Sequence, residues 1–278
     1  MVRCSRVIAI LPVVCVALCA LAFAGSETTP EKSLKPTAVH EQVEPFVEAF
    51  AETAVQTLDS APLNRILQKH LYDGRMDFAA LKKDAAARQD LEVFLAAIAR
   101  MPEGEPLASW INAYNALIID AVVQRYPLAS VTDVPDFFSK IMYKVAGKER
   151  SMDDVENGVM RPRFKDARIH MALNCGAVSC PKLPGLAFEQ ATLHERLDAL
   201  TREVVNDGDH IVLNDGKLEV SALFIWFKDD FIRDGGSLAG WFRKYADAGP
   251  LKTIPDDVPL VEQPYDWKLG AHIESTTD

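Results

Sequence analysis

The sequence lacks the short motifs that identify several large enzyme classes. Its 278 residues contain no glycine-rich phosphate-binding loop, no His-Glu-x-x-His pair and no Gly-x-Ser-x-Gly turn. These absences argue against a phosphate-loop nucleotide enzyme, a zincin-type metalloprotease and a serine hydrolase with a nucleophile elbow. Internal repeats and low-complexity tracts are also absent. The composition is instead that of an ordinary globular protein, and it gives no reason to expect a cofactor.

Positive charge is scarce. The chain has 30 Lys and Arg against 40 Asp and Glu, which gives a formal net charge of −10 at pH 7. Nucleic acids and anionic membrane surfaces attract proteins with a positive excess, so this chain is a poor candidate for either partner. A peptide or a small-molecule substrate of unknown identity remains as the expected partner.

Cysteine is also scarce, and three of the five cysteines lie in the first 24 residues. Those residues resemble a secretory signal, with Arg3 and Arg6 before an apolar stretch over 7–20 and the cleavage pattern Ala22-Phe23-Ala24. We therefore expect cleavage after Ala24, a secreted or periplasmic location and no stable membrane association afterwards. The apolar stretch is also long enough for a retained membrane anchor, which is the alternative.

The two remaining cysteines, Cys175 and Cys180, allow two interpretations. An exported protein meets an oxidising compartment, which favours a disulfide between them. A catalytic thiol with a neighbouring cysteine fits the same spacing. A third, weaker interpretation is a zinc site, but the four-residue gap is wider than in a zinc knuckle and no fourth ligand is evident.

Hydrophobic periodicity and turn residues predict one α+β domain over residues 45–278, after a flexible polar linker over 25–44. We expect N-terminal helices packed with a small, mostly antiparallel sheet. The predicted helices cover residues 45–58, 63–71, 78–83, 90–100, 107–125, 137–141, 152–161, 192–205, 221–233 and 237–246. Hairpins are predicted at 143–150 and 210–220, and a short apolar segment lies at 258–261.

The segment 168–183 holds the densest group of reactive side chains. Its apolar first half predicts a buried strand over 168–174, with His170, Ala172 and Asn174 on one face. Cys175 follows directly, and Cys180 comes after a turn that contains Gly176. We therefore expect the histidine and the two thiols to lie near one end of this strand.

The predicted helix over 107–125 is apolar around most of its circumference, so it should be largely buried. Asn112 and Asn115 lie three residues apart and therefore on one side of it. Buried amides need hydrogen-bond partners. The two side chains either clamp the helix to a loop or point into a functional site, and the sequence leaves both open.

Four segments together resemble one known family. They are Trp110–Leu117 (WINAYNAL), Ser151–Glu156 (SMDDVE), His170–Leu183 (HMALNCGAVSCPKL) and Tyr265–Leu269 (YDWKL). The chain resembles the domain of unknown function family number 547 over about residues 72–269. It also has a remote resemblance to papain-like and transglutaminase-like proteins, in which a thiol, a histidine and an amide or acid share a cleft. That second resemblance implies a cysteine-peptidase-like fold.

These residues suggest a thiol-dependent hydrolase or acyltransferase that acts on amide or thioester bonds. Cys175 would be the nucleophile and His170 its base, with Cys180 as a supporting or resolving thiol. Glu156, Asn112 or Asn115 would orient the imidazole, and the backbone N–H of Gly176 would hold an oxyanion. The alternative is a non-catalytic periplasmic protein with a Cys175–Cys180 disulfide that binds a ligand or a partner.

Overall fold

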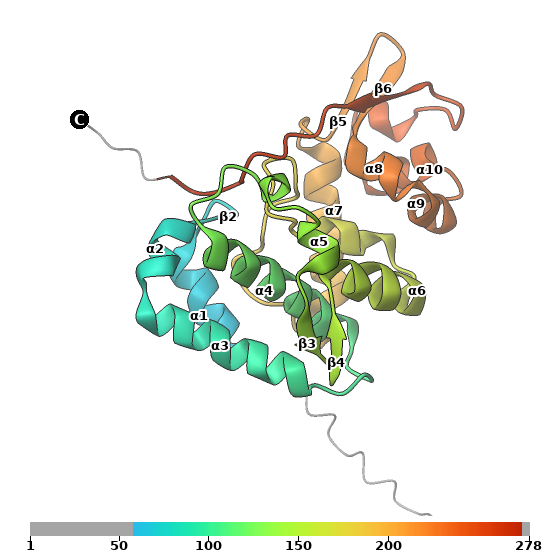
Figure 1. The fold of residues 1–278 in the computed structure, drawn as a ribbon. Helices are drawn as coiled ribbons and strands as arrows, with labels where there is room; N and C mark the ends of the chain where they lie inside the picture. Colours follow the sequence, from blue (N-terminus) through green and yellow to red (C-terminus); the bar gives the residue numbers. More distant parts are fainter. Residues whose placement is uncertain (1–57, 274–278) are drawn as a thin grey trace, which may run out of the picture. The chain divides into compact units, whose positions relative to one another are not determined.

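The computed structural model describes residues 58–273 (Figure 1). The predicted signal and linker, and nearly all of the helix predicted over 45–58, lie outside this range. No helix within residues 58–273 is both long and apolar enough to cross a membrane.

The first part of the described chain is a group of helices built around α4. These helices are α1 (Ala61–His70), α2 (Phe78–Lys83), α3 (Ala85–Arg100) and α4 (Leu107–Arg125). Asp77 and Asp84 cap α2 and α3, because their carboxylates accept backbone N–H bonds from the first turn of each helix. Every residue from Leu107 to Val123 is buried, which confirms the expectation for this helix. Figure 1 shows α4 beside α1, α2 and α3.

The strands form three separate small sheets. Two are hairpins, β1 (Leu71–Tyr72) with β2 (Arg75–Met76) and β3 (Tyr143–Val145) with β4 (Lys148–Arg150). The third contains β5 (Ile211–Asn214), β6 (Lys217–Ser221) and β7 (Leu260–Gln263), with β7 parallel to β6. The α+β class and both predicted hairpins are confirmed. Within residues 58–273 the expected small sheet is present as three sheets of two or three strands, and the β3–β4 hairpin packs against α3 of the N-terminal helices.

A second buried cluster surrounds the three-stranded sheet. It contains apolar side chains of α7 (Leu193–Asn206), α8 (Ala222–Trp226), α9 (Lys228–Gly235) and α10 (Leu238–Tyr245). Between α4 and α7 in sequence lie α5 (Phe137–Lys140), a π-helical segment η2 (Asp154–Met160), α6 (Arg161–Phe164) and a 3-10 helix η3 (Ala167–Met171). Shorter 3-10 helices occur at Val131–Asp133, Gln190–Thr192 and Pro250–Lys252.

The strand predicted over 168–174 is wrong. The segment begins with η3, in which Asp166 accepts the backbone N–H of Arg168 and caps the turn. The backbone N–H groups of Ala172 and Leu173 both donate to the carbonyl of Ile169, so the segment forms helical turns and not an extended strand. A short apolar stretch fits a buried helical turn as well as a buried strand, and here the aspartate cap favours the turn. His170, Ala172 and Asn174 therefore share no strand face.

Three helix predictions need smaller corrections. The helix predicted over 152–161 is mostly π-helical and continues through Pro162 into α6. The helix predicted over 221–233 is two helices that meet at Phe227. The helix predicted over 192–205 begins as a 3-10 turn over Gln190–Thr192 and becomes α-helical at Leu193.

Trp110 tests the central position of α4. Its side chain is 0% exposed, its indole N–H donates to the carbonyl of Glu105, and the Arg150 guanidinium lies 5.6 Å from its ring centroid. Trp110→Ala is expected to lower the free energy of unfolding by about 3–5 kcal/mol in chemical denaturation. Val93→Ala, at an exposed position of α3, should change it by less than about 0.5 kcal/mol. A loss below about 1 kcal/mol for Trp110→Ala contradicts this packing.

Candidate functional site

Four of the residues singled out in the sequence line one cavity of about 150 Å³. They are Glu156, His170, Cys175 and Cys180. The other lining residues are Tyr114, Phe138, Asp153, Asn157, Leu173, Leu223, Trp226, Phe227, Tyr265 and Trp267. Aromatic rings thus make up a large part of this cavity, which we call the aromatic cleft.

The aromatic cleft is assembled from segments far apart in the sequence. Glu156 comes from η2, His170 from η3, and Trp226 and Phe227 from the junction of α8 and α9. The C-terminal segment supplies Tyr265 and Trp267 after it leaves β7. Figure 1 shows this segment running from the three-stranded sheet back toward β2, where the N–H of His272 donates to the carbonyl of Met76.

Backbone hydrogen bonds fix the C-terminal segment beside the cysteine loop. The N–H groups of Val178 and Ser179 donate to the carbonyls of Lys268 and Asp266. The N–H of Gly270 donates to the carbonyl of Gly176 from the other side. These bonds hold the Tyr265–Trp267 segment against the loop and so place both rings in the aromatic cleft.

The two cysteines are joined in a disulfide, which is one of the two alternatives left open by the sequence. Cys180 is buried, whereas Cys175 is partly exposed. The Tyr265 hydroxyl donates to Cys180 Sγ at 3.2 Å and lies 3.3 Å from Cys175 Sγ. The disulfide therefore forms part of the cavity lining, with a phenol against both sulfur atoms.

Asn174 closes the cysteine loop. Its amide nitrogen donates to the carbonyl of Pro181, and its Oδ1 accepts the backbone N–H of Gly176 at 2.9 Å. Gly176 has a φ of +86°, and a Cβ at this position would lie 3.1 Å from Val131 Cγ1, so glycine is required for two reasons. Because its N–H already has a partner, the oxyanion role expected for Gly176 does not fit this arrangement.

His170 lies between two carboxylates and is only 2% exposed. Its Nε2 is 2.9 Å from Asp230 Oδ2, and its Nδ1 is 3.4 Å from Glu156 Oε1. The ring stacks on Phe227 with 3.9 Å between centroids. Within residues 58–273 no hydrogen bond joins the imidazole to either sulfur, although all three groups line the same cavity.

Asn112 and Asn115 clamp α4 to loops. Asn112 donates to the carbonyl of Phe188 and accepts the N–H of the same residue. Asn115 donates to the carbonyl of Ala172 and accepts the N–H of Asn174. Neither amide lines the aromatic cleft, and neither contacts His170. Asn115 acts on the site indirectly, because it fixes the backbone directly before the cysteine loop.

The pKa values of three ionisable groups in the aromatic cleft are raised by burial and by neighbouring carboxylates. Burial raises the pKa of Asp153, and the nearby charges of Glu156 and Asp154 raise it further. Burial, Glu156 and Asp153 also raise the pKa of the Tyr114 phenol well above its ordinary value. Burial raises the pKa of Tyr265, with Glu156 as a further cause and Arg75 as an opposing one. Burial is the first cause of each shift, and the Glu156 carboxylate adds to all three.

Asp230 is the site residue that sequence reasoning missed. Burial alone would raise its pKa, but hydrogen bonds from His170 and Arg161 outweigh burial and hold the pKa well below its ordinary range. Arg161 Nε and Arg233 Nη1 contact its two oxygens at 2.7 and 2.9 Å. In the sequence Asp230 is one of several acids near a helix start, and nothing marks its partner 60 residues earlier.

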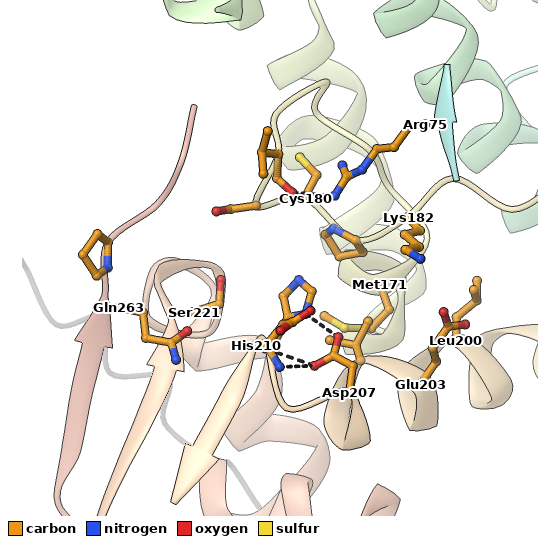
Figure 2. Close-up of a pocket in the computed structure, with 16 residues that line it drawn as sticks. Arg75, Met171, Cys180, Lys182, Leu200, Glu203, Asp207, His210, Ser221 and Gln263 are labelled. Atoms are coloured by element: carbon orange, nitrogen blue, oxygen red, sulfur yellow. Dashed lines mark hydrogen bonds and ion pairs between the residues drawn. The ribbon is translucent and has the colours of Figure 1, made fainter. Parts of the chain in front are cut away.

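A second cavity of about 340 Å³ shares Cys180 with the lining of the aromatic cleft. Figure 2 shows Arg75 and Lys182 on the side of the cysteine loop, and His210, Asp207 and Ser221 on the side of the three-stranded sheet. His210 Nδ1 lies 2.6 Å from Asp207 Oδ2. Acidic and basic groups are mixed around this cavity, so its charge favours no single class of ligand.

No group of three or more His, Cys, Asp and Glu side chains between residues 58 and 273 is arranged to hold a metal ion. The weaker zinc interpretation therefore gains no support from this part of the chain.

Comparison with known proteins gives one match. The model of the family described as "Protein of unknown function, DUF547" matches residues 98–205. This match confirms the resemblance inferred from the WINAYNAL helix and the His170–Leu183 segment. No curated protein and no solved structure matches the chain. The remote papain-like resemblance stays a prediction.

Asp230→Asn is expected to lower the free energy of unfolding by about 2–4 kcal/mol at pH 7, because buried His170 and two arginines lose an anionic partner. The native pKa of Asp230 is lowered, so its contribution is complete above the unfolded carboxyl pKa of about 4 and declines as the pH falls further. The difference between wild type and Asp230→Asn should thus be about 1 kcal/mol smaller at pH 3.

Urea denaturation at pH 7 and pH 3 measures both quantities. Asp229→Asn is the matched control, because Asp229 is the exposed neighbour and forms no ion pair within the described chain. A difference between wild type and Asp230→Asn that is equal at the two pH values contradicts the assigned pKa direction.

Proposed function

We propose that this chain, which carries the DUF547 segment, is an exported protein that binds a small ligand in the aromatic cleft. In this proposal the Cys175–Cys180 disulfide is structural and holds the loop that borders the cleft. The function is binding, and no bond of the ligand is broken.

The observation that supports this proposal most is that the cysteine and the histidine needed for thiol catalysis are both already bonded to other groups. Cys175 is bonded to Cys180, and both nitrogens of His170 face carboxylates. A thiol nucleophile requires a free thiolate and a base within hydrogen-bond reach of it. The same cavity has the mainly apolar and aromatic lining that is typical of small-molecule sites.

Two observations support export. Disulfides persist in oxidising compartments and are rare where glutathione keeps thiols reduced. The predicted signal peptide agrees with this location, and a cleaved signal would leave the ligand-binding domain free of the membrane.

Trp226 provides the test of ligand binding. It is 47% exposed although it is a large aromatic residue, and it lines the cleft. We expect a small-fragment library, screened by saturation-transfer NMR, to give binders whose affinity falls at least about tenfold in Trp226→Ala. Tyr72→Ala is the matched control, because Tyr72 is 46% exposed and stacks on His272 away from the cleft. Fragments that bind both variants equally, or a library without binders, contradict the proposal.

A second candidate is the thiol-dependent hydrolase or acyltransferase. The observation that favours it is that His170, Glu156 and Cys175 line the same cavity. After reduction of the disulfide by an external dithiol, Cys175 would attack the carbonyl carbon of an amide or thioester, and His170 would carry the thiol proton to the departing amine or thiol. Water or an acceptor nucleophile would then take the acyl group from Cys175. The His170 Nδ1 contact with Glu156 is long at 3.4 Å, so this nitrogen is the one that would have to turn toward Cys175.

Thiol reactivity separates the two candidates. We expect protein from its native compartment to resist alkylation until it is reduced. Once reduced, Cys175 should be alkylated with an apparent pKa at or above the ordinary value of about 8.5, because the cleft contains carboxylates that disfavour a thiolate. His170→Ala and Cys180→Ser should leave this pKa unchanged. A pKa well below 8.5 that rises in His170→Ala supports the hydrolase instead.

A further inference from the structure

The aromatic cleft has an uneven charge. Two carboxylates, Asp153 and Glu156, line it, and the lining includes neither lysine nor arginine. Cavities for neutral ligands have no need of such an excess, since an unpaired buried carboxylate is costly. The composition of the lining is therefore the first indication of the ligand's charge.

The surrounding ion pairs of the arginines centre on Asp230, which does not line the cleft, and not on Asp153 or Glu156. Asp230 receives Arg161 and Arg233 as well as His170, and the Arg161 guanidinium also lies over the Phe227 ring and donates to Asn157. Among the described residues, the ion pair of Glu156 is the long 3.4 Å contact with the same imidazole, and its carboxylate also interacts with the Tyr114 phenol. Asp153 forms no ion pair within residues 58–273, and burial raises its pKa, with the charges of Glu156 and Asp154 as further causes.

The aromatic rings supply a second, independent feature. Trp226 and Trp267 are stacked with 5.7 Å between centroids and an interplanar angle of 18°. Tyr265 lies 4.8 Å from the Trp226 ring and 4.7 Å from the Trp267 ring. The faces of such rings attract cations through the negative charge of their π-electrons. This attraction is stronger for tryptophan than for tyrosine or phenylalanine.

Burial gives the cleft a direction. Glu156 is 8% exposed and Tyr114 is 3% exposed, whereas Trp226 is 47% exposed. The carboxylate therefore lies at the inner end and the tryptophan at the mouth. With a volume of about 150 Å³, the cavity is below the roughly 300–1,000 Å³ of sites for larger organic ligands. It fits one small head group.

We propose that the ligand of the aromatic cleft is a small organic cation, an alkylammonium or quaternary ammonium group, held between the aromatic rings and the Asp153 and Glu156 carboxylates. This inference rests on the proposed binding function and adds the chemical class of the ligand. The aromatic rings cover the apolar substituents of the cation, and the carboxylates neutralise its charge.

Pairs of probes that differ only in charge test the inference. Choline is compared with its neutral isostere 3,3-dimethylbutan-1-ol, and n-butylammonium with 1-butanol, by calorimetric titration of the disulfide-intact protein. In at least one pair the cation is expected to bind at least about tenfold more tightly than the neutral compound.

Two variants assign this preference to the cleft. Asp153→Asn should weaken cation binding about 5- to 30-fold and change the binding of the neutral compound less than twofold. Asp229→Asn removes the same charge from an exposed residue that does not line the cleft, and it should change neither affinity more than twofold. Glu156→Gln should also weaken binding of the cation more than binding of the neutral compound.

The outcomes separate this inference from the function on which it rests. Equal affinities of cation and neutral isostere in both pairs, with both lost in Trp226→Ala, overturn the cationic class and keep the binding site. If none of the four probes binds while neutral fragments bind at Trp226, the cationic class is also overturned and the binding site is kept. If neither probes nor fragments bind the wild-type protein, the binding function itself is overturned. A cation preference that survives Asp153→Asn and Glu156→Gln also contradicts the inference.

Discussion

The contact between His170 and Asp230 is the interaction on which the arrangement of the aromatic cleft depends. The imidazole is buried, and the carboxylate that it meets comes from α9 in the C-terminal part of the chain. Buried ionisable groups are tolerated only when hydrogen bonds and opposite charges replace the lost water. Arg161 and Arg233 complete this requirement for Asp230. The network thus holds α9 against η3 and keeps Phe227 stacked on the imidazole.

Local signals in the sequence predicted much of the fold. The apolar periodicity of α4 gave its bounds, and the Asn214-Asp215-Gly216 turn located the β5–β6 hairpin. The strand predicted over 168–174 is wrong because four apolar residues among seven have no periodicity that separates a strand from a helical turn. The cap by Asp166 decides between the two, and one aspartate is a weak signal before the structure is seen. The parallel pairing of β7 with β6 is a long-range contact that no local pattern encodes.

Only part of the candidate site could be predicted from the sequence, because its other residues are brought in by long-range contacts. His170, Cys175 and Cys180 are close in sequence, and the SMDDVE segment added Glu156 through family resemblance. Asn112 and Asn115 were correctly recognised as buried amides, but their partners are the backbones of Phe188, Ala172 and Asn174. Asp230 and Trp226 enter the site only through tertiary packing. The excess of acidic residues in the cleft could not be predicted from the sequence. It depends on the tertiary contacts that pair Arg161 and Arg233 with Asp230 and not with Asp153 or Glu156.

Binding of a ligand in the aromatic cleft can be measured directly through the four tryptophans of the chain. In a proton–nitrogen correlation spectrum of ¹⁵N-labelled, disulfide-intact protein, each indole N–H gives one resonance. Trp226 and Trp267 line the cleft, whereas Trp110 and Trp241 are fully buried in the two apolar clusters. Titration with a bound cation or fragment should shift the resonances of Trp226 and Trp267 and leave the other two in place. Saturable binding that leaves both cleft resonances unmoved would contradict the account.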